Sequence, residues 1–272
     1  MWYNYNAEII KKEMIFIKKF LNILVSLILT TLAFAMVYSI TVDYEYETYI
    51  RINEHNEEVE IDPRTFEDED ELLRQMAYDY FNVKNKNNNL IGWLNVPNIG
   101  YYPVMATDNN SFYLNHDEYD KYWGNGSVFM NTESLHSFSD TALLHGHHIR
   151  NGKMFGSLVK FKDEKFFQKN DLSLIFDGEN FYYYKQYTTF LLKDGEEWIK
   201  QHGLNEVERE EYMSSLYRRS MVKMEEGLEP NLKEQMLFLQ TCDYTFTNAR
   251  LIVGFYRVRT IPYNPAIHGP FN

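Results

Sequence analysis

Residues 236–255 read MLFLQTCDYTFTNARLIVGF and contain the pattern that decides the fold. Met236–Gln240 is an apolar run of strand length, and Asp243–Ala249 is rich in polar and turn-forming residues. The run after Arg250 is apolar again, and short apolar runs bounded by turn residues are typical of β-strands. We therefore predict two strands joined by a loop, with Cys242 ending the first strand and Arg250 opening the second.

The sequence before this stretch shows the same alternation of short apolar runs and turns. Strands are predicted near residues 91–96, 101–105, 127–130, 141–145, 172–176, 181–192, 236–241 and 250–260. About eight strands in one unit predict a closed or nearly closed β-barrel. The predicted fold class is mainly β, with two helical additions to the barrel.

The two helical additions differ in their signals. Residues 68–83 combine an acidic first turn with one apolar face, which predicts an N-terminal helix. A helical insertion is predicted at about residues 196–219, before the strand that contains the cysteine. Within it, Asn205 and Glu208 have the spacing of a capping box, in which each side chain binds the other residue's backbone N–H.

The composition of the 272-residue chain is that of an acidic globular protein. Its 27 lysines and arginines against 39 aspartates and glutamates give a formal charge of −12. Because no basic stripe could displace phosphate counterions, nucleic acid is not an expected partner. The single cysteine excludes an intrachain disulfide framework and a cysteine-rich zinc site. No cofactor is predicted.

Residues 20–40, FLNILVSLILTTLAFAMVYSI, form an uncharged apolar stretch. A helix rises ~1.5 Å per residue, so this stretch would span about 30 Å, the thickness of a hydrocarbon core. Lys18 and Lys19 precede it and acidic residues follow, which predicts a cytoplasmic segment 1–19 and an extracellular body. The alternative is a cleaved signal peptide, because Ala33-Phe34-Ala35 resembles a cleavage site. Both interpretations export the body.

An acidic linker is predicted at residues 41–71, between the membrane anchor and the folded body. Residues 42–71 hold 13 of the 39 acidic residues and only two arginines. Such a self-repelling segment suits an extended spacer. The folded domain is then expected at residues 72–262, followed by a C-terminal tail at 263–272.

Cys242 is the first candidate for chemistry. An arginine placed across a short loop could reach the sulfur, where its charge would favour the thiolate and stabilise a developing oxyanion. The alternative is that Cys242 is an unreactive apolar residue of the core, a common fate of free cysteine.

Histidines at the end of another predicted strand are the second candidate. The strand at 141–145 runs into His145-Gly146-His147-His148, and a histidine at a strand end beside a glycine suits acid–base chemistry. His145 and His147 also have a spacing that metal ligands use. No HExxH motif or second histidine cluster accompanies them, so no metal site is predicted.

Together these blocks resemble the sortase family, and its class B members most closely. The strings that carry the resemblance occur in family order: IGWLNVPNIGYYPV (91–104), DNNSFYLNHD (108–117), ALLHGHHIRNGKMFGSL (142–158) and FLQTCDYTFTNARLIVGF (238–255). The resemblance implies a cysteine transpeptidase on the eight-stranded sortase barrel. Residues 72–262 would be its catalytic domain, and the insertion at 196–219 matches the helix that class B members carry before the cysteine strand.

The resemblance also implies roles for particular residues. The family's Gly-His pair falls on Gly146-His147, its Thr-Cys pair on Thr241-Cys242 and its arginine on Arg250. The implied catalytic residues are therefore His147, Cys242 and Arg250. The implied substrate-binding residues are Asn110, Leu114, His145, Gln240 and Thr241. His145, Phe238 and Gln240 depart from the residues usual in class B, which bears on the peptide preference more than on the chemistry.

The implied function is that of a membrane-anchored extracellular transpeptidase on a Gram-positive-type surface. Such an enzyme cleaves the C-terminal sorting signal of an exported protein through a thioacyl intermediate, and transfers the acyl group to an amine. The acceptor would be a peptidoglycan precursor, a pilin-like subunit or another surface protein. The alternatives are a different exported cysteine peptidase, in which Cys normally precedes His along the chain, and a non-catalytic barrel that binds ligands at the surface.

Overall fold

The structure is a computed structural model that describes residues 69–134, 137–138, 141–169, 172–196, 204–224, 230 and 233–269. All of these residues belong to one compact unit, Pro63–Asn272. The predicted cytoplasmic segment 1–19, the membrane segment 20–40 and the linker as far as residue 68 lie outside the described residues. Among the residues that the structure describes, no helix is both long and apolar enough to cross a membrane.

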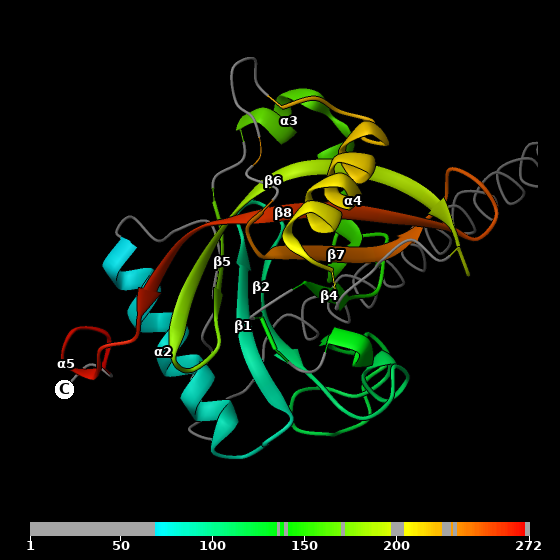
Figure 1. Ribbon diagram of the computed structural model, residues 1–272. Helices are drawn as coiled ribbons and strands as arrows, with labels where there is room; N and C mark the ends of the chain where they lie inside the picture. The colour runs from blue at the N-terminus through cyan, green and yellow to red at the C-terminus, as the bar shows by residue number, and fades with distance from the viewer. Residues whose placement is uncertain are drawn as a thin grey trace, which may run out of the picture. The chain divides into compact units, whose positions relative to one another are not determined.

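Eight strands close into a barrel in the order β1-β2-β3-β4-β7-β8-β6-β5 (Figure 1). Their bounds are Leu90–Val96 (β1), Gly100–Met105 (β2), Val128–Met130 (β3), Ala142–His145 (β4), Ser173–Phe176 (β5), Asn180–Lys193 (β6), Met236–Asp243 (β7) and Ala249–Pro262 (β8). The predicted eight-stranded barrel is confirmed. The strand ends differ from prediction by at most two residues, since alternation and turn residues mark strands locally.

The longest pairing joins β6 to β8, two curved strands that cross most of the view in Figure 1. The pairing is antiparallel and runs from Asn180 opposite Pro262 to Lys193 opposite Ala249. Two irregularities in register, at Tyr183/Tyr184 and Gln186/Thr188, bend the ribbon. Because the pairing continues to Lys193 opposite Ala249, the last residues of β6 lie beside the first residues of β8.

The barrel interior is apolar and closely packed. Every strand contributes to it, and its fully buried members include Leu94, Val104, Leu144, Leu239 and Val253. Dense packing of this kind holds the strand ends in fixed positions, because shifting one strand would open voids along its length.

Helices cover parts of the barrel. Helix α2 (Glu69–Lys84) packs against β1 and β5, as Figure 1 shows, and matches the helix predicted at 68–83. The short helix α5 (Pro265–His268) contacts α2, so the predicted C-terminal tail contains a packed element. The remaining short elements are η1 (Phe112–Leu114), η2 (Thr132–Ser134), η3 (Phe155–Lys162) and α3 (Glu164–Lys169).

The helix of the predicted insertion is α4 (Glu206–Arg218), which packs against β6. It begins at Glu206, later than the predicted residue 196, because Asn205 caps its first turn. Asp194 and Gly195 form a turn after β6, and residues 197–203 lie outside the described ranges. The predicted capping box is confirmed: Asn205 accepts from the backbone N–H of Glu208, and Glu208 accepts from that of Asn205. This reciprocal pair satisfies backbone donors that a helix start otherwise leaves without partners.

Candidate active site

Cys242 and Arg250 face each other across the pairing of β7 with β8. They are Cα partners in the antiparallel register, so their side chains lie on the same face of the barrel wall. The Nη1 group of Arg250 donates to the Sγ atom of Cys242 at 3.1 Å. Cys242 is half-buried, and the guanidinium charge of Arg250 lies directly beside its sulfur.

The other terminal nitrogen of Arg250 binds a residue that sequence reasoning missed. Nη2 lies 3.0 Å from an oxygen of the Asp194 carboxylate, at the end of β6. Leu192 is opposite Arg250 in the β6–β8 register. Asp194 lies two residues after Leu192, so it is the diagonal neighbour of Arg250 on the same face. The backbone N–H of Asp194 also donates to the carbonyl of Asn248 at 2.8 Å.

The segment that carries His147 follows a parallel pairing of β4 with β7. The last pair of that ladder is His145 opposite Gln240. Beyond it, the N–H of Gly146 donates to the carbonyl of Gln240 at 3.2 Å, and the hydroxyl of Thr241 donates to the carbonyl of Gly146 at 2.8 Å. The chain therefore reaches His147 directly alongside the residues that lead to Cys242.

Glycine at position 146 lets the chain pass closely over the core. A Cβ atom there would lie 2.7 Å from the ring of Phe155, which is fully buried. The N–H of Phe155 in turn donates to the carbonyl of His147 at 2.9 Å. Phe155 therefore contacts the chain on both sides of the His147 side chain: its ring packs against Gly146, and its N–H binds the His147 carbonyl.

The imidazole of His147 contacts the loop that contains η1. Its Nε2 atom lies 2.7 Å from the backbone carbonyl oxygen of Leu114. Because a carbonyl only accepts, Nε2 must carry the proton in this contact. This leaves Nδ1 as the ring nitrogen available for proton exchange with a substrate.

His148, which was not predicted as a site residue, also binds the cysteine segment. Its Nδ1 donates to the backbone carbonyl of Cys242 at 2.7 Å, and its ring packs edge-on against Tyr244 at 4.8 Å between centroids. The only signal in the sequence is its place in the run of histidines after β4. Its contacts hold the two strand ends together.

His145 is held as a neutral imidazole. Asn131 accepts from the N–H of Glu133 through its oxygen, so its amide nitrogen is the group that lies 3.1 Å from Nε2 of His145. Nε2 therefore accepts. Burial, and then the charge of Arg250, lower the pKa of His145 to about 4. His145 is thus uncharged at neutral pH and is not a cation in the site.

Known proteins resemble the chain in both sequence and structure. No family model matches it. Sortase B of Staphylococcus aureus is 24% identical over 172 residues, which cover 61% of this chain and 69% of the relative. The X-ray structure of Clostridium perfringens sortase B superposes with a TM-score of 0.61 at 29% identity, covering 66% of this chain and 99% of that one. The chain belongs to the sortase family and is class B-like.

These class B relatives also define the enzyme class of this sortase, which is a cysteine transpeptidase. A further solved structure, the Staphylococcus aureus sortase B–substrate complex, shares its fold with a TM-score of 0.60 at 20% identity. The match covers 70% of this chain and 94% of that one.

The residues predicted to bind substrate lie in different environments of this sortase. Asn110 and Leu114 are exposed, and Asn110 is tied to Thr132 by hydrogen bonds of 2.9 and 3.2 Å. Gln240 is half-buried on β7. Thr241 is only 2% exposed, and its hydroxyl is engaged by Gly146. The contact of Thr241 is therefore structural, and its role in substrate binding stays a prediction.

The chain after Cys242 is anchored in this sortase by Asp243. Its carboxylate pairs with Lys162 and accepts from the N–H of Thr245 at 2.9 Å. Burial raises the pKa of Asp243, but the hydrogen bonds from Lys162 and Thr245 outweigh burial, so its pKa falls below the ordinary range. Strand β7 continues through Asp243, and the loop predicted at 243–249 is shortened to residues 244–248.

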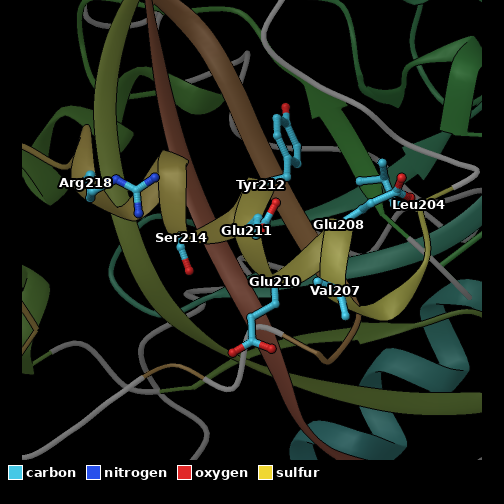
Figure 2. Close-up of a pocket in the computed structure, with 8 residues that line it drawn as sticks. All are labelled: Leu204, Val207, Glu208, Glu210, Glu211, Tyr212, Ser214 and Arg218. Atoms are coloured by element: carbon cyan, nitrogen blue, oxygen red, sulfur yellow. The ribbon is translucent and has the colours of Figure 1, made fainter.

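A pocket of about 830 Å³ lies elsewhere, along α4 (Figure 2). It is lined by Leu204, Val207, Glu208, Glu210, Glu211, Tyr212, Ser214 and Arg218, none of which is a predicted site residue. Within the described ranges, no group of three or more His, Cys, Asp or Glu side chains could hold a metal ion.

Proposed function

We propose that this sortase is a membrane-anchored extracellular enzyme that cleaves C-terminal sorting signals of exported proteins and joins them to an amine. The observation that carries the proposal is the 3.1 Å contact between Nη1 of Arg250 and Sγ of Cys242. The hydrogen bonds that lead His147 alongside β7 support the same site. The proposed anchor rests on the uncharged stretch at residues 20–40.

In the first half-reaction, the thiolate of Cys242 attacks a carbonyl carbon of the sorting signal and forms a C–S bond. Arg250 and the backbone N–H that follows Cys242 would stabilise the negative charge on the carbonyl oxygen. The C–N bond then breaks, and His147 as imidazolium gives its proton to the leaving amine. The enzyme is left as a thioacyl intermediate with a neutral His147.

In the second half-reaction, an acceptor amine resolves the thioester. Neutral His147 removes a proton from the amine, which attacks the thioester carbon and forms a new amide bond. The C–S bond breaks and Cys242 returns to its thiolate, so every proton and bond of the cycle is accounted for. The open Nδ1 of His147 is the ring nitrogen suited to both transfers, because Nε2 is engaged by Leu114.

The proposed partners follow from this chemistry. The donor would be an exported protein with a C-terminal sorting signal, in line with the relative from Staphylococcus aureus that was solved with its substrate. The acceptor would be an amine of a peptidoglycan precursor, a pilin-like subunit or another surface protein. Anchoring enzyme and substrates in one membrane would raise their effective concentration.

The test uses the full chain in mild detergent and a library of sorting-signal peptides. We expect cleavage of some peptides, and a covalent adduct on Cys242 with the mass of the acyl fragment. Adding glycine-based amines should shift the product from the free acid to the amide. The control is the Cys242→Ala variant, and full turnover by that variant would contradict the assignment of the nucleophile.

A further inference from the structure

Arg250 lies between two acceptors on the two strands that flank it. On the β7 side, Nη1 contacts Cys242 at 3.1 Å, and on the β6 side, Nη2 contacts the Asp194 carboxylate at 3.0 Å. The guanidinium is planar and its two terminal nitrogens form a rigid fork. Fixing one branch therefore fixes the direction of the other.

Exposure differs between the two partners of the ion pair. The Arg250 side chain is 24% exposed and that of Asp194 is 51% exposed. A pair this open to water contributes little to folding stability. The ion pair instead selects one orientation of the Arg250 guanidinium.

The end of β6 is itself held in place. The N–H of Asp194 donates to the carbonyl of Asn248, so the main chain of Asp194 is bound to the loop that precedes β8. The carboxylate is thus presented to Arg250 from a fixed backbone. A charge held in this way can orient a partner at low entropic cost, which is the basis of preorganised transition-state stabilisation.

We propose that Asp194 is a positioning residue that holds one arm of the Arg250 guanidinium, so that Nη1 alone is directed at Cys242 and the oxyanion formed there. This inference rests on the proposed function, in which Arg250 stabilises the oxyanion. Without Asp194, both arms can turn onto the sulfur or into solvent, and the donor is no longer aimed at the carbonyl oxygen.

The chain offers a matched control two residues away. Glu196 is also an acidic residue after β6, but it binds Arg219 at 2.7 Å. The test compares Asp194→Asn, Asp194→Glu and Glu196→Gln in the full chain, purified in mild detergent. Thermal melting of each variant shows whether it is folded.

The first readout is NMR of the arginine side chains, with the Arg250 signals assigned by their loss in Arg250→Lys. We expect slow rotation about the Nε–Cζ bond in the wild type and in Glu196→Gln, with separate signals for the two arms. In Asp194→Asn the signals should merge, and Asp194→Glu should restore their separation. This readout does not depend on any enzymatic activity.

The second readout is cleavage of a sorting-signal peptide that the wild type accepts. Asp194→Asn should lower kcat about tenfold, less than the ~10²–10³-fold loss on removing an oxyanion donor outright. KM should change by no more than about twofold, since ground-state binding is untouched. Asp194→Glu should recover much of kcat, and Glu196→Gln should match the wild type.

The outcomes separate this inference from the function it rests on. Unchanged Arg250 signals or unchanged kcat in a folded Asp194→Asn variant would overturn the positioning role. Equal losses in Asp194→Asn and Glu196→Gln would also overturn it. If the wild type cleaves no peptide, the proposed function fails, while the NMR comparison still decides whether Asp194 orients Arg250.

Discussion

The hydroxyl of Thr241 donates a 2.8 Å hydrogen bond to the carbonyl oxygen of Gly146. These two residues immediately precede Cys242 and His147, so this one bond joins the two strand ends that carry the proposed nucleophile and the proposed acid–base residue. The Thr241 side chain is nearly fully buried, where a lost hydrogen bond leaves a group unsatisfied.

Thr241→Val keeps the shape of the side chain and removes this donor. We expect the free energy of unfolding to fall by about 1–2 kcal/mol. Because small displacements of catalytic groups are costly, kcat/KM for a cleaved peptide should fall about tenfold. Thr241→Ser retains the hydroxyl and should stay near the wild type. Urea unfolding and peptide cleavage measure the two effects, and equal kcat/KM for the valine and serine variants would refute the positioning argument.

Arg250→Lys tests the planar fork rather than the charge. Lysine keeps the positive charge, but it cannot contact Cys242 and Asp194 with two fixed nitrogens. We expect kcat/KM to fall by about 10²-fold or more. The control is Arg257→Lys on the same strand, where the guanidinium lies over the Tyr182 ring and binds Gln235, away from the thiol. Near-wild-type cleavage by Arg250→Lys would show that charge alone is sufficient.

Gly146→Ala tests the close passage of the chain over the core. The added Cβ would lie 2.7 Å from the buried Phe155 ring, so either the ring or the backbone beside His147 must shift. Overpacking of this kind costs about 1–3 kcal/mol, and kcat/KM should fall with it. Gly124→Ala is the matched control, because a Cβ there meets nothing within 4 Å. If both variants melt and cleave alike, the passage is not under steric constraint.

His145 predicts an acid-dependent loss of stability. Its pKa is about 4 in the folded chain, because of burial and the charge of Arg250, and ~6.5 in an unfolded chain. Between these values the unfolded state binds more protons, so the free energy of unfolding rises with pH there and falls as pH drops from 6.5 towards 4. His145→Gln should have a flatter profile in this window. Denaturant unfolding at several pH values measures this dependence. Parallel pH profiles for the wild type and His145→Gln would contradict the prediction.

Much of the barrel could be predicted because its signals are local. Short apolar runs mark the strands, and the turn residues between them mark the strand ends, so the eight predicted strands match the observed ones closely. The capping box of Asn205 and Glu208 is another local signal, since both partners lie within one helical turn. The predicted loop at 243–249 was too long, because the pairing of Asp243 with Ala249 extends both strands.

The site was predictable only in part, because only some of its contacts join residues that are close together along the chain. Cys242 and Arg250 flank a short loop, so a hairpin places them opposite each other. Asp194 has no such signal, because its contact with Arg250 depends on the register along the whole of β6 and β8 and on two irregularities in it. The Leu114 carbonyl that binds His147 is a backbone group, which any residue type could supply.

The amino-acid sequence by itself determined the strands, the helix start at Asn205, the resemblance to sortases and the spacing of the cysteine from the arginine. The strands, the helix start and the cysteine–arginine spacing rest on interactions among residues close together along the chain, and the resemblance rests on motifs in family order. Only the tertiary structure decided which acceptor holds each arm of Arg250, which nitrogen of His147 stays open and that His145 is neutral. Those features depend on the closure and register of the barrel and on burial, which arise only when distant segments pack together.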